Sequence, residues 1–227
     1  MSGCNLVIFD IDGTLLDTTE GIESAVRYTI REKKLPELTS QQIRAFVGPP
    51  IQDSFSRAYG IEDKEYLQEL AGIFRDRYKD YDLFKARPYD GIYEVCDRLR
   101  QEGISMAVAT YKREDYAVSI MEHFGFDRYM SAIYGGDHEN KLKKKDIIMK
   151  CLTEKQRRME NGKSEEISEL DAVMVGDTMH DAAGAEEAGI DFIGVTYGFG
   201  FQQKSEIMHL GCAGGADTPL ELLKLIF

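Results

Sequence analysis

The sequence predicts an α/β protein in which a doubly wound, Rossmann-like parallel sheet of about five strands is joined to a separate all-helical domain. Three observations support this. Short apolar runs, typical of strands buried on both faces, alternate with helical patterns in residues 1–15 and 86–227. Residues 16–85 show helical patterns only. The 227 residues suffice for one large domain with a smaller insert.

The all-helical domain is predicted from apolar spacing and from helix-end signals. Asp17, with Glu20 three residues later, is a start signal for its first helix, and Thr39 with Gln42 forms a capping-box pattern for a short second one. Gly60 is placed to end a third helix. Apolar residues recur at helical spacing within residues 17–34, 39–48, 51–59 and 67–81.

Strand and helix patterns alternate through the remaining residues. The predicted strands are residues 6–9, 104–109, 131–134, 172–175 and 192–195. The predicted helices cover residues 91–101, 115–124, 182–188 and 219–226, with another beginning at 146. Ligands of such sheets bind beyond the carboxyl ends of the strands. Because Asp10, Thr110 and Asp177 each follow a predicted strand, we expect a functional site there.

Asp10 and Asp12 directly follow the first strand and precede Gly13. Side chains two residues apart on an extended segment point the same way, so these carboxylates need a cation, a proton or amide donors nearby. The pair fits a polar turn, or a site where one carboxylate attacks while its neighbour moves a proton. A calcium loop is excluded, because Gly13 is fourth from Asp10 and the twelfth residue is Gly21 rather than glutamate.

Asp177 and Asp181 follow the fourth strand, and a cluster of carboxylates suits magnesium. For Asp177 the metal is favoured, whereas Asp181 fits either a metal site or a helix cap. One lysine is needed to balance these charges. Lys144 lies just ahead of a predicted helix, and Lys143 and Lys145 are alternatives.

Composition restricts the function classes. The formal charge of −12 and the pI near 4.9 argue against a nucleic-acid surface, so any anion site must be locally positive. The four cysteines are far apart and fit neither a zinc site nor a disulfide framework. No apolar run approaches the roughly 20 residues of a membrane span. The start of the chain lacks the basic and apolar regions of a secretory signal, and we expect a cytoplasmic protein.

These motifs together resemble the haloacid dehalogenase-like phosphohydrolases. The resemblance covers Asp10-Ile11-Asp12-Gly13-Thr14-Leu15-Leu16-Asp17, then Thr110, Lys144, and Asp177 with Asp181, in the family's order. It implies that residues 16–85 form the family's first type of cap. Three further segments resemble the phosphoglycolate phosphatase-like branch: residues 47–50, 88–91 and 197–200. Two features depart from the pattern: Tyr111 follows the motif threonine, and the lysine region lacks a Lys-Pro pair.

The resemblance implies a role for each motif residue. Asp10 would be the nucleophile and Asp12 the acid and base. Thr110 and Lys144 would bind the phosphate. Magnesium would be held by Asp10, the Asp12 carbonyl oxygen and Asp177, with Asp181 in a supporting role. The predicted specificity residues of the cap are Arg44, Gly48 and Pro49.

The implied activity is hydrolysis of a small phosphorylated metabolite, with 2-phosphoglycolate as the first candidate. Pyrophosphate, nucleoside monophosphates and sugar phosphates remain open as substrates. So do a phosphosugar mutase resembling β-phosphoglucomutase and a non-catalytic binding module. The second aspartate, Asp12, favours phosphate esters over halides, because a halide leaving group needs no proton. We expect no nucleic-acid or membrane partner, and a monomer or weak homodimer.

Overall fold

The computed structural model describes residues 3–138, 141–161, 171–210 and 212–227. The chain divides into two compact units: Met1–Leu16 with Pro88–Phe227, here called the core unit, and Asp17–Arg87, called the helical unit. Strands β2 (Leu16–Asp17) and β3 (Arg87–Pro88) form a two-stranded sheet. The sequence showed no strand pattern at β2, whose two residues are too few to give one. Across the four described ranges, no helix is long and apolar enough to cross a membrane.

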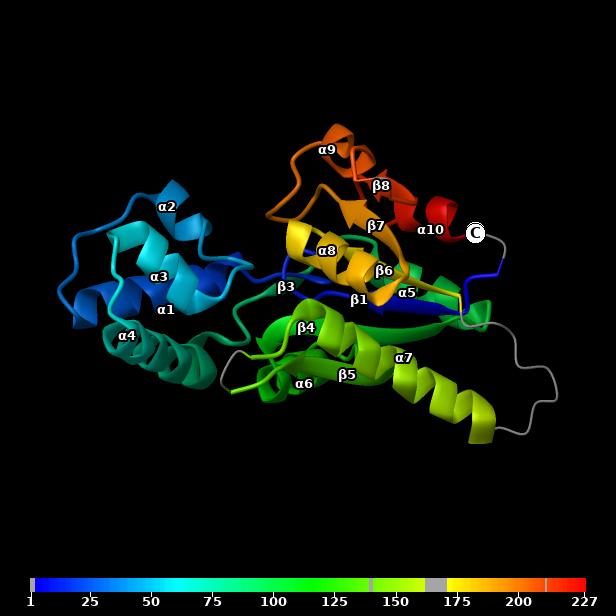
Figure 1. Ribbon diagram of the computed structural model, residues 1–227, viewed down its shortest axis with the longest axis horizontal. Coiled ribbons are helices and arrows are strands. Elements are labelled where there is room, and N and C mark those ends of the chain that lie inside the picture. Colours follow the sequence, from blue (N-terminus) through cyan, green and yellow to red (C-terminus); the bar gives the residue numbers. More distant parts are fainter. Residues whose placement is uncertain (1–2, 139–140, 162–170, 211) are drawn as a thin grey trace. The chain divides into compact units, whose positions relative to one another are not determined.

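The core unit is built on one parallel sheet, so the predicted fold class is confirmed (Figure 1). Its strand order is β5-β4-β1-β6-β7-β8. The sheet has six strands rather than about five, because Gly214–Ala216 pairs with β7. Two glycines and an alanine give no apolar run from which this strand could be predicted. The strands are β1 (Leu6–Phe9), β4 (Ser105–Arg113), β5 (Met130–Gly136), β6 (Ala172–Gly176), β7 (Asp191–Val195) and β8 (Gly214–Ala216).

Helices cover both faces of this sheet. Residues Leu6 and Ile8 of β1 face α7 and α8, whose apolar side chains join them in one buried cluster. Helices α5 and α6 lie on the opposite face (Figure 1). The helices are α5 (Ile92–Gln101), α6 (Glu114–His123), α7 (Lys144–Asn161), α8 (Met179–Ala188), α9 (Lys204–Met208) and α10 (Glu221–Ile226). Helix α9 was not predicted. A charged stretch up to Glu169 was expected after Leu152; its residues 153–161 continue α7, and residues 162–169 fall outside the described ranges.

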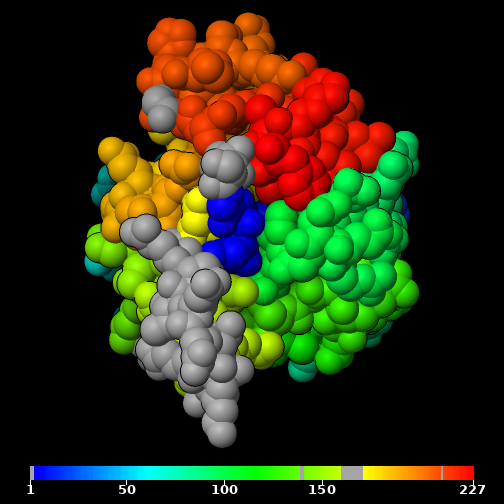
Figure 2. All heavy atoms as spheres, turned by 90° about the vertical axis from the view of Figure 1, so that its right-hand side faces the viewer, coloured from blue at the N-terminus to red at the C-terminus, as the bar shows by residue number. Residues whose placement is uncertain are grey.

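The winding of the sheet reverses at β1. This strand pairs with β4 on one side and with β6 on the other, so the carboxyl ends of all three meet at one edge. Figure 2 looks at the opposite edge, where the blue N-terminal segment comes to the surface between segments of the core unit. There the backbone N–H of Asn5 donates to the carbonyl of Asp171 at 2.9 Å.

The helical unit contains α1 (Thr19–Glu32), α2 (Ser40–Arg44), α3 (Ile51–Tyr59) and α4 (Lys64–Arg77), the last continued by one wide turn, η1 (Tyr78–Asp82). The capping box at Thr39 is confirmed, and Gly60 ends α3 at φ 67°. Asp17 stabilises the start of α1 by accepting from the Thr19 N–H at 3.1 Å. The apolar spacing predicted for residues 67–81 does not extend to Tyr81, which is 66% exposed.

Candidate active site

Three buried carboxylates gather at the carboxyl edge of the sheet. Asp10 follows β1, Asp177 follows β6, and Asp181 lies in the first turn of α8. One oxygen of each lies within 4.8 Å of the others. Carboxylates this close and this deeply buried repel one another unless cations compensate them. The sequence predicted Asp10 and Asp177 at one edge from strand ends alone.

Lys144 supplies the first compensating charge. It is the first residue of α7 and is only 3% exposed, whereas Lys143 and Lys145 are exposed. Its Nζ lies 2.8 Å from Oδ1 of Asp10 and 2.7 Å from Oδ1 of Asp181. Burial opposes the ammonium charge, but the two carboxylates outweigh it and raise the pKa of Lys144. The geometry therefore distinguishes Lys144 from its neighbours in the lysine run.

The loop after β7 holds Asp177 from one side. Oδ2 of Asp177 accepts from the N–H groups of Phe199 at 2.7 Å and Gly200 at 3.2 Å. Its Oδ1 is buried and has no hydrogen-bond partner among the described residues. Gly13 has φ 82°, and a Cβ atom there would lie 2.6 Å from Cγ of Asp177. Only glycine fits this approach, which brings the segment after β1 against the segment after β6.

Asp12 is paired separately, with Lys112. The ion pair measures 3.0 Å between Oδ2 and Nζ, and the side chains are 13% and 5% exposed. Thr110 is buried, and its Oγ1 accepts from the Lys112 N–H at 3.2 Å. Sequence reasoning missed Lys112. Its position two residues after Thr110, at the same strand end, was the available signal.

Asp181 fulfils the helix-cap alternative left open by the sequence. Its Oδ2 accepts from the backbone N–H of Thr178 at 3.0 Å and from the Thr178 hydroxyl at 2.7 Å. Its other oxygen, Oδ1, forms the ion pair with Lys144, and the Asp181 carboxylate is one of the three in the acidic cluster. One carboxylate thus anchors the start of α8 and contributes to the site. His180 is exposed, and its ring lies edge-on to Tyr111.

Comparisons with known proteins agree with this arrangement. Residues 7–195 match the family model described as haloacid dehalogenase-like hydrolase. The chain belongs to this family. A 5'-nucleotidase of Pseudomonas aeruginosa is 33% identical over 198 residues, which is 87% of this chain and 85% of the relative. A phosphoglycolate phosphatase of Agrobacterium fabrum is 33% identical over 204 residues, 86% and 81% of the two chains.

A solved structure extends the likeness to the whole chain. A haloacid dehalogenase-like hydrolase from Streptococcus pneumoniae superposes with a TM-score of 0.86 at 29% identity, covering 100% of both chains. The predicted family resemblance is therefore confirmed. The family and its relatives named as phosphatases support phosphatase activity for this haloacid dehalogenase-like hydrolase.

The electrostatics of this hydrolase's site fit a divalent cation. Burial raises the pKa of Asp10, Lys144 opposes this effect, and the charges of Asp181 and Asp12 add to it, so that the pKa lies at about 6. Burial, followed by Asp181 and Asp10, raises the pKa of Asp177 well above its usual range. Asp177 also carries the buried oxygen without a partner. Three carboxylates, one of which has an unpartnered oxygen, supply the hard oxygen ligands that Mg²⁺ prefers.

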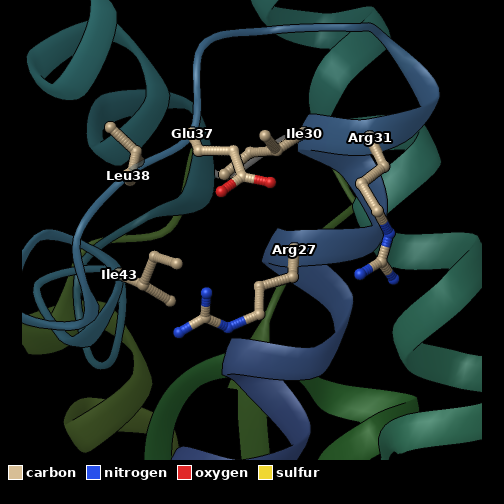
Figure 3. Close-up of a pocket in the computed structure, with 6 residues that line it drawn as sticks. All are labelled: Arg27, Ile30, Arg31, Glu37, Leu38 and Ile43. Atoms are coloured by element: carbon tan, nitrogen blue, oxygen red, sulfur yellow. The ribbon is translucent and has the colours of Figure 1, made fainter.

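The predicted specificity residues of the cap lie in the helical unit. Arg44 is exposed, with Nε 3.6 Å from Oε1 of Glu23, and Gly48 adopts φ 101° next to half-buried Pro49. A pocket of about 50 Å³ lies inside this unit, and Figure 3 shows Arg27 and Glu37 directed toward it. A pocket of this volume holds a few water molecules and is too small for a phosphorylated metabolite. The role of Arg44, Gly48 and Pro49 in specificity stays a prediction.

The raised pKa of Asp10 predicts how stability depends on pH. Without metal, the folded state binds more protons than the unfolded state between about pH 4 and the folded pKa of about 6. The contribution of Asp10 to the free energy of unfolding therefore falls as pH rises through this range. Asp10→Asn removes that loss. As pH rises from 4 to 7, we therefore expect the free energy of unfolding of the variant to increase by roughly 1–3 kcal/mol relative to that of the wild type.

Urea unfolding in EDTA at several pH values measures this difference. Asp217→Asn is the control, because Asp217 follows β8 and its exposed contacts with Thr196 and Lys204 lower its pKa instead. A difference between Asp10→Asn and wild type that does not change with pH would contradict the prediction.

Proposed function

We propose that this enzyme is a magnesium-dependent phosphomonoester hydrolase that acts through an aspartyl phosphate on Asp10. The observation that carries the proposal is that the two aspartates of Asp10-Ile11-Asp12 have different charged partners. Asp10 lies among Lys144, Asp177 and Asp181, while Asp12 contacts Lys112. Two carboxylates two residues apart thus have separate surroundings, as separate chemical roles require.

Magnesium would be held by Asp10, Asp177 and the carbonyl oxygen of Asp12, with Asp181 in support. When bound, it offsets the repulsion between these carboxylates and an incoming phosphate. The unpartnered Oδ1 of Asp177 and the raised pKa of Asp10 support this assignment. Both are features that a bound cation would relieve.

The chain's own residues divide the reaction between them. A carboxylate oxygen of Asp10 attacks phosphorus and forms the phosphoenzyme as the ester oxygen leaves. Asp12 donates a proton to that leaving oxygen and later removes one from the water that hydrolyses the intermediate. Lys144 and the Thr110 hydroxyl hold phosphate oxygens, so charge stabilisation and positioning supply most of the rate.

The substrate proposed first is 2-phosphoglycolate. The branch motifs and the phosphoglycolate phosphatase of Agrobacterium fabrum support it. Arg44 would meet the substrate carboxylate, with Gly48 and Pro49 shaping the same loop, as the cap closes and excludes water. A nucleoside monophosphate is the second candidate, because the Pseudomonas aeruginosa relative is a 5'-nucleotidase. We further propose a cytoplasmic enzyme that works as a monomer or weak homodimer.

Phosphate release from a substrate panel at fixed magnesium tests this proposal. The panel contains 2-phosphoglycolate, pyrophosphate, nucleoside monophosphates, hexose phosphates and p-nitrophenyl phosphate, each with an EDTA control. Preferential release from 2-phosphoglycolate supports the first candidate. Preference for another substrate keeps the phosphatase mechanism and rejects that candidate. No release from any compound, or release unaffected by EDTA, rejects the proposed function.

Magnesium binding is expected to raise the thermal stability of the enzyme without any substrate. Binding to the folded state alone stabilises it by about 2.7 kcal/mol at a ligand concentration 100 times the Kd. Asp177→Asn removes one charge and one ligand oxygen, so its melting temperature should respond much less to magnesium. Differential scanning fluorimetry across a magnesium titration measures both proteins. Equal responses of the two would contradict Asp177 as a ligand.

A further inference from the structure

Strand β4 leaves its regular pairing with β5 just where it reaches the site. Ala109 pairs with Tyr134 and Arg113 with Gly136, so residues 110–112 stand opposite the single residue Gly135. A bulge of this kind turns side chains away from the alternation of the strand. Here it includes Thr110, whose side chain is buried, and Lys112, which contacts Asp12.

The two glycines at the end of β5 make room for this bulge. A Cβ atom on Gly135 would lie 2.6 Å from Cα of Glu114, and one on Gly136 would lie 2.8 Å from the carbonyl oxygen of Tyr111. Both distances are too short for any side chain. The Gly135-Gly136 pair is therefore part of the structure that presents residues 110–112.

Tyr111, in the middle of the bulge, contacts both ends of Lys144. Its hydroxyl oxygen accepts a hydrogen bond from the Lys144 backbone N–H at 3.0 Å. Its ring centroid lies 5.4 Å from the Lys144 Nζ, within the range of a cation–π interaction. The edge-on contact with His180, at 5.6 Å between ring centroids, adds a contact with α8. One side chain thus touches the two helices that supply Lys144 and Asp181.

The backbone bond is informative because of where it lies. Lys144 is the first residue of α7, and the first N–H groups of a helix have no partner within it. Tyr111 supplies that partner from strand β4. A lysine side chain loses considerable conformational freedom when it is held in one place, so fixing its backbone and its ammonium group reduces the loss that remains on phosphate binding.

We propose that Tyr111 is a positioning residue that holds Lys144 against Asp10 for phosphate binding. This inference rests on the proposed phosphatase function and assigns a role to a residue that departs from the family pattern. Tyr111 acts through Lys144 and does not itself touch the reacting atoms.

Two substitutions separate its two contacts. Tyr111→Phe keeps the ring and removes the hydroxyl acceptor, and we expect a rise of about 3-fold in the KM and in the inhibition constant of inorganic phosphate. Tyr111→Leu removes both contacts, and we expect about 10-fold in each. Because Lys144 also holds the nucleophile, kcat should fall in the same order. The smaller effect of Tyr111→Phe than of Tyr111→Leu then measures the contribution of the ring apart from that of the hydroxyl.

Tyr134 provides a matched control on the neighbouring strand. Its ring lies 5.7 Å from Nζ of Lys150, on the same helix α7 but outside the acidic cluster. Tyr134→Leu should leave KM, kcat and the phosphate inhibition constant close to wild type. Equal effects of Tyr111→Leu and Tyr134→Leu would overturn the proposal, because they would indicate a general loss of packing.

Amide hydrogen exchange tests the same contact without turnover. The Lys144 amide should exchange at least about 5-fold faster in Tyr111→Phe than in the wild type, since its acceptor is lost. Unchanged exchange overturns the proposal even in an active enzyme. If the wild type releases no phosphate from any substrate, the proposed function fails by itself, and faster exchange would still establish that Tyr111 holds Lys144.

Discussion

Asp10→Asn is expected to abolish phosphate release, with kcat falling by on the order of 10⁴-fold or more. The amide oxygen is a poor nucleophile and cannot form the phosphoenzyme. The fold should persist, because asparagine resembles the protonated acid that burial already favours at this position. Steady-state phosphate release at saturating magnesium, together with trapping of phosphoenzyme by acid quench, measures both parts of the expectation.

Asp217→Asn is the control for this substitution as well. Asp217 directly follows β8 of the same sheet, but it binds Lys204 and Thr196 at the surface. Its variant should keep wild-type turnover. Turnover in Asp10→Asn well above the expected residual level would exclude Asp10 as the nucleophile, and a comparable loss in Asp217→Asn would show that the assay reports sheet integrity instead.

The arrangement of the sheet was predictable because its strands are read from local sequence. Buried parallel strands are short apolar runs, and their carboxyl ends share one edge, so Asp10 and Asp177 were placed together correctly. β8 and α9 were not predicted, because neither gives a local pattern that can be recognised in the sequence. Each is too short, and β8 too rich in glycine, for a periodic pattern to form.

The charge pairs of the site depend on contacts that no local pattern contains. Four lysines between residues 141 and 145 read alike in sequence, and only the start of α7 buries Lys144. Lys112 pairs with Asp12, 100 positions earlier in the chain, because a bulge interrupts β4. That bulge depends in turn on Gly135 and Gly136, which the sequence showed only as the end of a strand. Side-chain partners across elements were therefore the part that needed a structure.

Lys144→Met is expected to impair both activity and stability, which makes it the most demanding test of the site. Methionine keeps much of the side-chain volume beside Gly184, where a Cβ atom would already lie 2.7 Å from Cγ of Lys144. It removes the charge that compensates Asp10 and Asp181. Losing one partner of a buried ion pair costs about 3–5 kcal/mol, and we expect turnover to fall by on the order of 10²-fold or more.

The neighbouring lysines give this test its controls. Lys143→Met and Lys145→Met alter exposed side chains. The free energy of unfolding of both variants should therefore lie within about 0.5 kcal/mol of the wild-type value, and both should keep wild-type turnover. Urea unfolding in EDTA and phosphate release measure all three variants. The stability loss of Lys144→Met should shrink toward pH 4, because protonation of Asp10 removes the charge left unpaired. A loss of equal size in either neighbour, or one that does not change with pH, would mean that the charge balance of the site does not depend on Lys144.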